Sequence, residues 1–166
     1  THTQAAQLSA ETLARFAKEV AKYPADQKVS AVMACLAIVQ QEQGWVSAQA
    51  EQAVGDYLGM PAIAVKEVTT FYNMYNQQPV GKYKLNVCTN LPCQLRDGQK
   101  TLQYLCSKLG VEMGGTTQDG LFTVQQSECL GACADAPVML VNDRSMCSFM
   151  TSDKLDQLVD GLRQAK

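Results

Sequence analysis

The chain has 166 residues, of which 46% are hydrophobic and 18% charged, and its formal net charge is -2. This composition is ordinary for a globular protein, and the small net charge provides no basic surface for nucleic acid. No apolar run approaches the length of about 20 residues that a bilayer-spanning helix requires. The N-terminal segment has the pattern of an amphipathic helix and not of a signal peptide. We therefore expect a soluble, cytoplasmic protein without direct membrane insertion.

The numbers of cysteines and histidines limit the kinds of functional site that the chain can form. Seven cysteines are an odd and high number for an intracellular chain, so a framework of disulfides explains them poorly. The single histidine, His2, excludes a Rieske centre, which needs two, and most histidine-based acid-base catalysis. Thiolate chemistry is the expectation that remains.

The first half of the sequence has the apolar spacing of helices. A first helix is expected over Ser9–Lys22, with its first residue as the N-cap. A second apolar stripe ends before Gly44. Ser47 caps a third helix that ends at Gly59, and Pro61 occupies the first position of a fourth. The residues expected to form the shared core of this helical bundle are Leu13, Phe16, Val20, Val29, Val32, Met33, Leu36, Val39, Val54, Tyr57, Leu58, Val68, Phe71, Tyr72 and Tyr75.

The segment Gln77–Gly81 interrupts the helical pattern with proline and glycine. After it, apolar and polar residues alternate as in a strand. We therefore predict two domains, a helical bundle over residues 1–80 and a second domain over residues 81–166.

The second domain has a mixed pattern. A strand over Tyr83–Val87 leads into Cys88, a helix ends at Gly110, and another strand starts at Phe122. The predicted hairpin contains the apolar run Val138–Val141, an Asn142-Asp143 turn and a strand over Arg144–Met150, and Thr151 or Ser152 then caps a last helix. The order strand, helix, strand, strand, strand, helix predicts an α/β fold of the thioredoxin type.

Four of the cysteines form two closely spaced pairs. Cys88 and Cys93 are separated by four residues, Cys129 and Cys133 by three, and each pair is expected in a loop after a strand. Sulfur ligands select zinc, copper(I) or iron-sulfur clusters over hard cations. Four thiolates suit either a mononuclear zinc ion or a 2Fe-2S cluster.

The residues between the cysteines favour a cluster over zinc only moderately. Leu91-Pro92 and Leu130–Ala132 offer apolar cover and close approach of the backbone. Spacing alone leaves a structural zinc site and a redox dithiol open. A thioredoxin-type oxidoreductase is the least favoured of these, because the chain has no C-x-x-C pair.

The other three cysteines, Cys35, Cys106 and Cys147, are expected to be core thiols because each lies in an apolar pattern. Trp45 and the Phe71-Tyr72 pair are likewise interpreted as packing residues and not as cofactor contacts.

Two motifs resemble a known family. The run CTNLPC at Cys88–Cys93, followed after 35 residues by ECLGACADAP at Glu128–Pro137, is similar to the small 2Fe-2S subunit of NADH-quinone oxidoreductase, the bacterial respiratory complex I. Similar stretches also occur at Glu67–Tyr72, Gln78–Gly81 and Pro137–Asp143, so the resemblance covers nearly the whole chain from about Ser9.

The resemblance implies a fold, a cofactor and a ligand set. The family has a thioredoxin-like ferredoxin domain preceded by a helical region. It binds one 2Fe-2S cluster through four cysteines that correspond here to Cys88, Cys93, Cys129 and Cys133. The chain lacks the proline-rich C-terminal extension of mitochondrial members, which favours a bacterial source.

The resemblance also implies partners. A one-electron cluster cannot accept the hydride of NADH, and this chain has no G-x-G-x-x-G motif, so it holds no complete active site. The family implies that NADH and FMN bind to a larger flavoprotein subunit, beside other peripheral-arm subunits of complex I. The chain would then lie on the cytoplasmic face of the inner membrane as part of that complex.

Two alternatives stay open on the sequence. The same electron-transfer role could belong to the diaphorase module of a soluble NAD-linked hydrogenase or formate dehydrogenase. A protein of another class, a zinc-binding interaction module with a helical docking bundle, has the same cysteine spacing. A visible spectrum with metal analysis separates the second alternative from an electron carrier.

Overall fold

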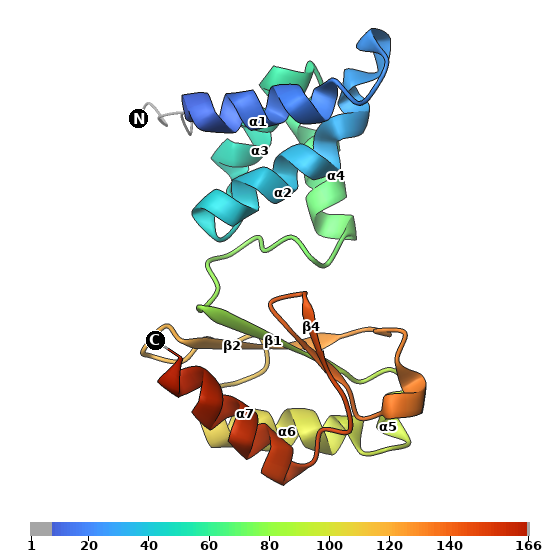
Figure 1. The fold of residues 1–166 in the computed structure, drawn as a ribbon, viewed down its shortest axis with the longest axis vertical. Coiled ribbons are helices and arrows are strands. Elements are labelled where there is room, and N and C mark those ends of the chain that lie inside the picture. The colour runs from blue at the N-terminus through green and yellow to red at the C-terminus, as the bar shows by residue number, and fades with distance from the viewer. Residues whose placement is uncertain (1–7, 166) are drawn as a thin grey trace. The chain divides into compact units, whose positions relative to one another are not determined.

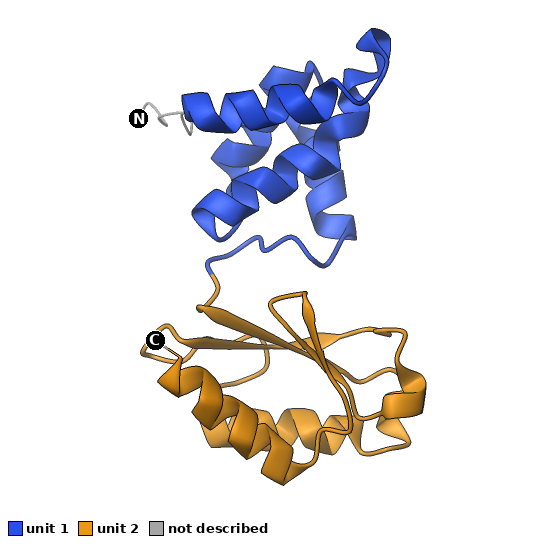
Figure 2. Cartoon of the chain, viewed as in Figure 1, with its two compact units in different colours: residues 1–79 blue, residues 80–166 orange. Residues whose placement is uncertain are grey.

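The structure, a computed structural model, describes residues 8–165. The chain divides into two compact units, Thr1–Pro79 and Val80–Lys166 (Figure 2). The first unit is helical and the second combines helices with a sheet (Figure 1). Within the described range, no helix is both long and apolar enough to cross a membrane.

Most helix ends of the first unit lie where local signals predict. Ser9 and Ser47 each accept a hydrogen bond from the backbone N–H three residues later, at 3.0 and 3.1 Å. Gly44 and Gly59 adopt left-handed conformations directly after their helices. Pro61 is the N-cap of its helix and not, as predicted, the first helical residue. The elements are α1 (Ala10–Val20), the 3-10 helix η1 (Ala25–Ala31), α2 (Val32–Gln43), α3 (Ala48–Leu58) and α4 (Ala62–Phe71).

Most of the expected core of this unit is confirmed. Its largest fully buried side chains are Phe16, Leu36, Val39, Val46, Val54, Leu58 and Val65. Cys35 is also fully buried, as expected for a core thiol, and burial raises its pKa to about 12. Trp45 is half-buried.

The core prediction is wrong for four residues. Phe71 is 79% exposed, and Leu13, Val29 and Tyr72 are more than a third exposed. Phe71 and Tyr72 are not buried because α4 ends at Phe71 and the backbone is extended at Tyr72, so helical spacing no longer predicts which side chains face the core. Val29 is not on the buried face of α2 because it belongs to the 3-10 helix η1, whose side-chain spacing differs from that of an α-helix.

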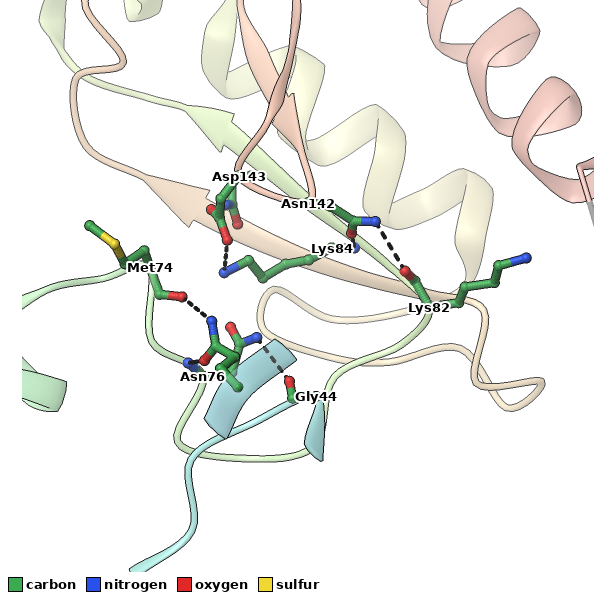
Figure 3. A network of polar contacts seen from close by, with 9 residues as sticks. Gly44, Met74, Asn76, Lys82, Lys84, Asn142 and Asp143 are labelled. Carbon is green, nitrogen blue, oxygen red and sulfur yellow. Dashed lines mark hydrogen bonds and ion pairs between the residues drawn. The ribbon is translucent and has the colours of Figure 1, made fainter. Parts of the chain in front are cut away.

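A polar cluster fixes the segment that follows α4. Gln40 donates to the carbonyl of Met74 at 2.7 Å and accepts from the backbone N–H of Asn76 at 2.6 Å. The Asn76 side chain donates to the carbonyl of Gly44 at 3.2 Å (Figure 3). Tyr75 between them is buried, and its hydroxyl donates to the Met33 carbonyl at 2.9 Å.

Gly55 in α3 gives a stability prediction. A Cβ at this position would lie 2.7 Å from the Met60 carbonyl oxygen, a backbone atom that cannot turn aside. We expect Gly55→Ala to cost about 2 kcal/mol of unfolding free energy, more than the roughly 1 kcal/mol that alanine gains in a helix. Gly161→Ala is the matched control, because that helical glycine has open space around it and should gain stability. Urea unfolding followed by circular dichroism measures both, and a Gly55→Ala protein as stable as wild type would contradict the prediction.

The second unit is built on a four-stranded sheet in the order β2-β1-β3-β4. Strand β1 pairs in parallel with β2 and antiparallel with β3, which pairs antiparallel with β4. Helices α6 and α7 cover one face of the sheet (Figure 1) and close a core with Leu85, Val87, Leu105, Phe122 and Met139. The strands are β1 (Tyr83–Cys88), β2 (Phe122–Ser127), β3 (Met139–Val141) and β4 (Ser145–Cys147). The helical segments are α5 (Leu91–Gln94), α6 (Gly98–Leu109), the 3-10 turn η2 (Cys133–Asp135) and α7 (Ser152–Gln164).

The predicted turn between β3 and β4 is confirmed. Asn142 and Asp143 have φ of 53° and 55°, as a two-residue hairpin turn requires. The Asn142 side chain accepts from the N–H of Lys84 at 2.7 Å and donates to the Lys82 carbonyl at 3.2 Å (Figure 3). The Lys84 ammonium also pairs with the Asp143 carboxylate at 2.5 Å. The hairpin therefore binds β1 through side chains as well as through its backbone ladder.

Candidate functional site

The first cysteine pair lies where β1 ends. Cys88 is the last residue of β1, and Cys93 lies in the short helix α5, not in a loop as predicted. Both side chains are 1% exposed. They pack in a small apolar cluster with Ala136 and Val138, partly covered by Leu130 and Ala132.

The second pair follows β2. Cys129 is exposed two residues after the end of β2, and Cys133 is half-buried at the start of η2. Because β1 and β2 are parallel and Cys88 is in register with Ser127, the segments that carry the two pairs leave the same end of the sheet.

The four thiols influence one another. The pKa of Cys93 is raised to about 11, mainly by burial and then by the interactions with Cys88 and the charge of Cys133. The pKa of Cys133 is also raised, first by a hydrogen bond with Cys129, and then by burial and by the charges of Cys129 and Cys88. The structure therefore places Cys93 near enough to Cys88 and Cys133, and Cys133 near enough to Cys129 and Cys88, for their charges to interact.

Backbone N–H groups also donate to the sulfurs. The N–H of Gly131 donates to the Cys129 sulfur at 3.4 Å. A backbone hydrogen bond from Val138 lowers the pKa of Cys93. Such donors stabilise thiolates, and around a bound metal centre they tune its reduction potential.

Gly98, the first residue of α6, packs directly against the first pair. A Cβ there would lie 2.8 Å from the carbonyl oxygens of both Cys88 and Cys93. The sequence alone did not point to this residue. A glycine five positions after Cys93 is the only local signal, and it does not reveal what the glycine touches.

Asp135 fixes the C-terminal end of the segment that carries Cys129 and Cys133. Its carboxylate accepts from the Ser148 hydroxyl at 3.0 Å, and its carbonyl accepts from the Phe149 N–H at 2.8 Å. These bonds fasten η2 to the chain between β4 and α7. Strand β4 covers Ser145–Cys147 and is shorter than the predicted Arg144–Met150.

Cys106 and Cys147 are the other cysteines of the second unit. Cys106 and Cys147 are half-buried and pack against the core of the second unit, and burial raises the pKa of each. Both cysteines therefore pack against the core, as predicted.

The four thiols group as two and two. Over residues 8–165, no three histidine, cysteine, aspartate or glutamate side chains are arranged to hold one metal ion. A 2Fe-2S cluster has two irons and takes two protein ligands on each. The number, softness and paired grouping of the thiols, with their apolar cover and N–H donors, fit that cluster.

Comparison with known proteins identifies the family. The model of the thioredoxin-like [2Fe-2S] ferredoxin family matches residues 16–163. The chain belongs to this family. The predicted α/β fold class, with a thioredoxin-like ferredoxin domain, is thereby confirmed, as is the 2Fe-2S cluster as the family's cofactor.

Curated relatives agree with this membership of the thioredoxin-like [2Fe-2S] ferredoxins. The chain is 41% identical over 145 residues to a NADH-quinone oxidoreductase subunit of Rickettsia conorii, the one designated E, covering 87% of this chain and 86% of that protein. It is 40% identical over 146 residues to NADH-quinone oxidoreductase subunit 2 of Thermus thermophilus, covering 88% and 81%. The resemblance noted from the motifs is therefore confirmed.

A solved structure shares the fold. The NAD+-reducing [NiFe]-hydrogenase in its H2-reduced state aligns with a TM-score of 0.68 at 20% identity, covering 81% of this chain and 22% of the hydrogenase chain. The air-oxidised state of that enzyme aligns with a TM-score of 0.69. This chain spans about a fifth of the hydrogenase chain, and the likeness concerns the fold alone.

Proposed function

We propose that the chain is an electron-transfer subunit of NADH-quinone oxidoreductase that holds one 2Fe-2S cluster. The observation that carries the proposal is the pairing of four thiols at one end of two parallel strands. Support comes from relatives about 40% identical that are named as subunits of that enzyme. The chain is thus part of an oxidoreductase, without a complete active site of its own.

Cys88, Cys93, Cys129 and Cys133 are the proposed ligands. Cys88 and Cys93, each almost fully buried, would form one side of the centre under apolar cover. Cys129 and Cys133 would form the more exposed side, where the Gly131 N–H already points at sulfur. Metal binding has to displace the thiol protons, because the thiolate is the ligand form.

The bound cluster supplies one-electron chemistry, whereas NADH delivers two electrons as a hydride. The proposal therefore requires a flavin in a partner, and the proposed partner is the larger flavoprotein subunit that binds FMN and NADH. Other peripheral-arm subunits complete the assembly, at the cytoplasmic face of the bacterial inner membrane. We further propose that residues 1–80 and 81–166 are separate domains, of which the second holds the cluster and the first serves docking.

Anaerobic co-expression with the flavoprotein subunit tests this role. We expect a stable complex in which NADH bleaches the visible absorbance of the cluster and produces the paramagnetic signal of a reduced 2Fe-2S centre. The chain without its partner, mixed with NADH, should stay oxidised. A complex that holds the oxidised cluster but never reduces it with NADH would argue against the proposed role, and a colourless chain with one zinc would favour the zinc-binding module.

A further inference from the structure

A side-chain hydrogen bond joins the two segments that carry the cysteine pairs. The Asn90 side-chain amide donates to a carboxylate oxygen of Glu128 at 3.0 Å. Asn90 lies between Cys88 and Cys93, and Glu128 directly precedes Cys129. The bond therefore links the two halves of the proposed centre.

This bond continues the contact between β1 and β2. The parallel register of the strands ends at Cys88 and Ser127. Beyond it, the N–H of Thr89 still donates to the Ser127 carbonyl at 3.2 Å. Asn90 and Glu128 are the next residues on the two sides, so their side chains extend the pairing into the cysteine segments.

The conformation of Asn90 points to the same role. It is the N-cap of α5, with φ of -65° and ψ of 159°, where an asparagine side chain usually accepts a hydrogen bond from the first turn. Its side chain makes no such capping bond. The amide is directed to Glu128 instead.

Glu128 adds a charge beside a proposed ligand. A cluster with four thiolates gains one negative charge on reduction, so a nearby carboxylate disfavours the reduced form. The hydrogen bond from Asn90 restrains that carboxylate in its place next to Cys129. Position and charge can therefore be separated by mutation.

We propose that Asn90 and Glu128 are positioning residues of the centre. Their bond keeps the Cys88–Cys93 segment and the Cys129–Cys133 segment from separating, and the Glu128 carboxylate lowers the reduction potential. This inference rests on the proposed function, because it takes the four cysteines as the ligands.

The test uses the full chain, reconstituted anaerobically with iron and sulfide. Asn90→Ala removes the bond, Asn90→Asp replaces it by repulsion at nearly constant shape, and Glu128→Gln keeps an acceptor for Asn90 but removes the charge. Asp119→Asn is the charge control, because Asp119 lies in the turn directly before Phe122, where β2 begins, whereas Cys129 follows the other end of that strand. The readouts are the rate at which an iron chelator bleaches the visible absorbance and the midpoint potential in a dye-mediated titration.

We expect both Asn90 variants to lose iron about three- to tenfold faster than wild type, the range that one net hydrogen bond supports. Glu128→Gln should release iron at nearly the wild-type rate and shift the potential to a more positive value, while Asp119→Asn changes neither. Wild-type release rates in both Asn90 variants would overturn the bond's role, and an unshifted potential in Glu128→Gln would overturn the charge's role. A wild-type chain that assembles no two-iron, two-sulfide centre would instead refute the proposed function.

Discussion

Replacing Cys93 by alanine is expected to abolish the two-iron centre. Cys93 is 1% exposed and packs in the same apolar cluster as Cys88, so its loss would leave one iron with a missing ligand in apolar surroundings where water is a poor substitute. The purified variant should have lost nearly all of the visible absorbance of the reconstituted wild-type chain. Cys129→Ala should have the same effect from the exposed side.

Cys106→Ala is the matched control for these variants. Cys106 is a free thiol of the same unit, and it packs half-buried against the core of the sheet and not in the apolar cluster of Cys88 and Cys93. Its replacement should keep the full absorbance, at a cost in stability of about 1 kcal/mol for the lost packing. Full absorbance in Cys93→Ala, or loss of absorbance in Cys106→Ala, would contradict the ligand assignment.

Gly98→Ala is expected to have the second largest effect, although Gly98 is not a proposed ligand. The new methyl group would lie 2.8 Å from the carbonyl oxygens of Cys88 and Cys93, so the backbone that carries both thiols must shift. Overpacking of this kind costs about 1 to 3 kcal/mol, and here the shift acts directly on ligand geometry. We expect iron content after reconstitution to fall to about half or less of the wild-type value.

Gly161→Ala is the control for Gly98→Ala, because it makes the same substitution in a helix of the same unit with nothing within 4 Å. It should retain the wild-type iron content. Circular dichroism of the metal-free proteins distinguishes a local shift at the cysteines from general unfolding. A Gly98→Ala protein with full iron content would show that the close contact places no constraint on the centre.

Short-range signals predicted most element boundaries correctly. A serine or threonine cap specifies a helix start through one local hydrogen bond, as at Ser9, Ser47 and Thr151. A glycine specifies a helix end because it adopts the left-handed conformation readily, as at Gly59 and Gly110. Such signals act within four residues and need no knowledge of the fold.

Features that depend on tertiary contacts could not be predicted in this way. The helical spacing of aromatic residues at Phe71 and Tyr75 continues past the end of α4, and only the folded chain buries one and exposes the other. Helix α5, at four residues, is too short for any periodic pattern.

The same difference between local signals and tertiary contacts applies to the candidate site. The spacing of the cysteine pairs, with their expected place after two strands, selected the four proposed ligands, of which Cys88 ends β1 and Cys129 follows β2. The contact of Gly98 with both cysteine carbonyls and the bond from Asn90 to Glu128 join residues 5 or more positions apart in sequence, and no local pattern reports them.

The most direct test of the proposed centre is the iron, acid-labile sulfide and zinc content of the anaerobically purified chain, measured together with its visible spectrum. We predict a coloured protein with about two irons and two sulfides per chain and no zinc, as a 2Fe-2S cluster on four thiolates requires. A colourless protein with a single zinc ion, or one free of metal with its paired cysteines oxidised to disulfides, would contradict the assignment.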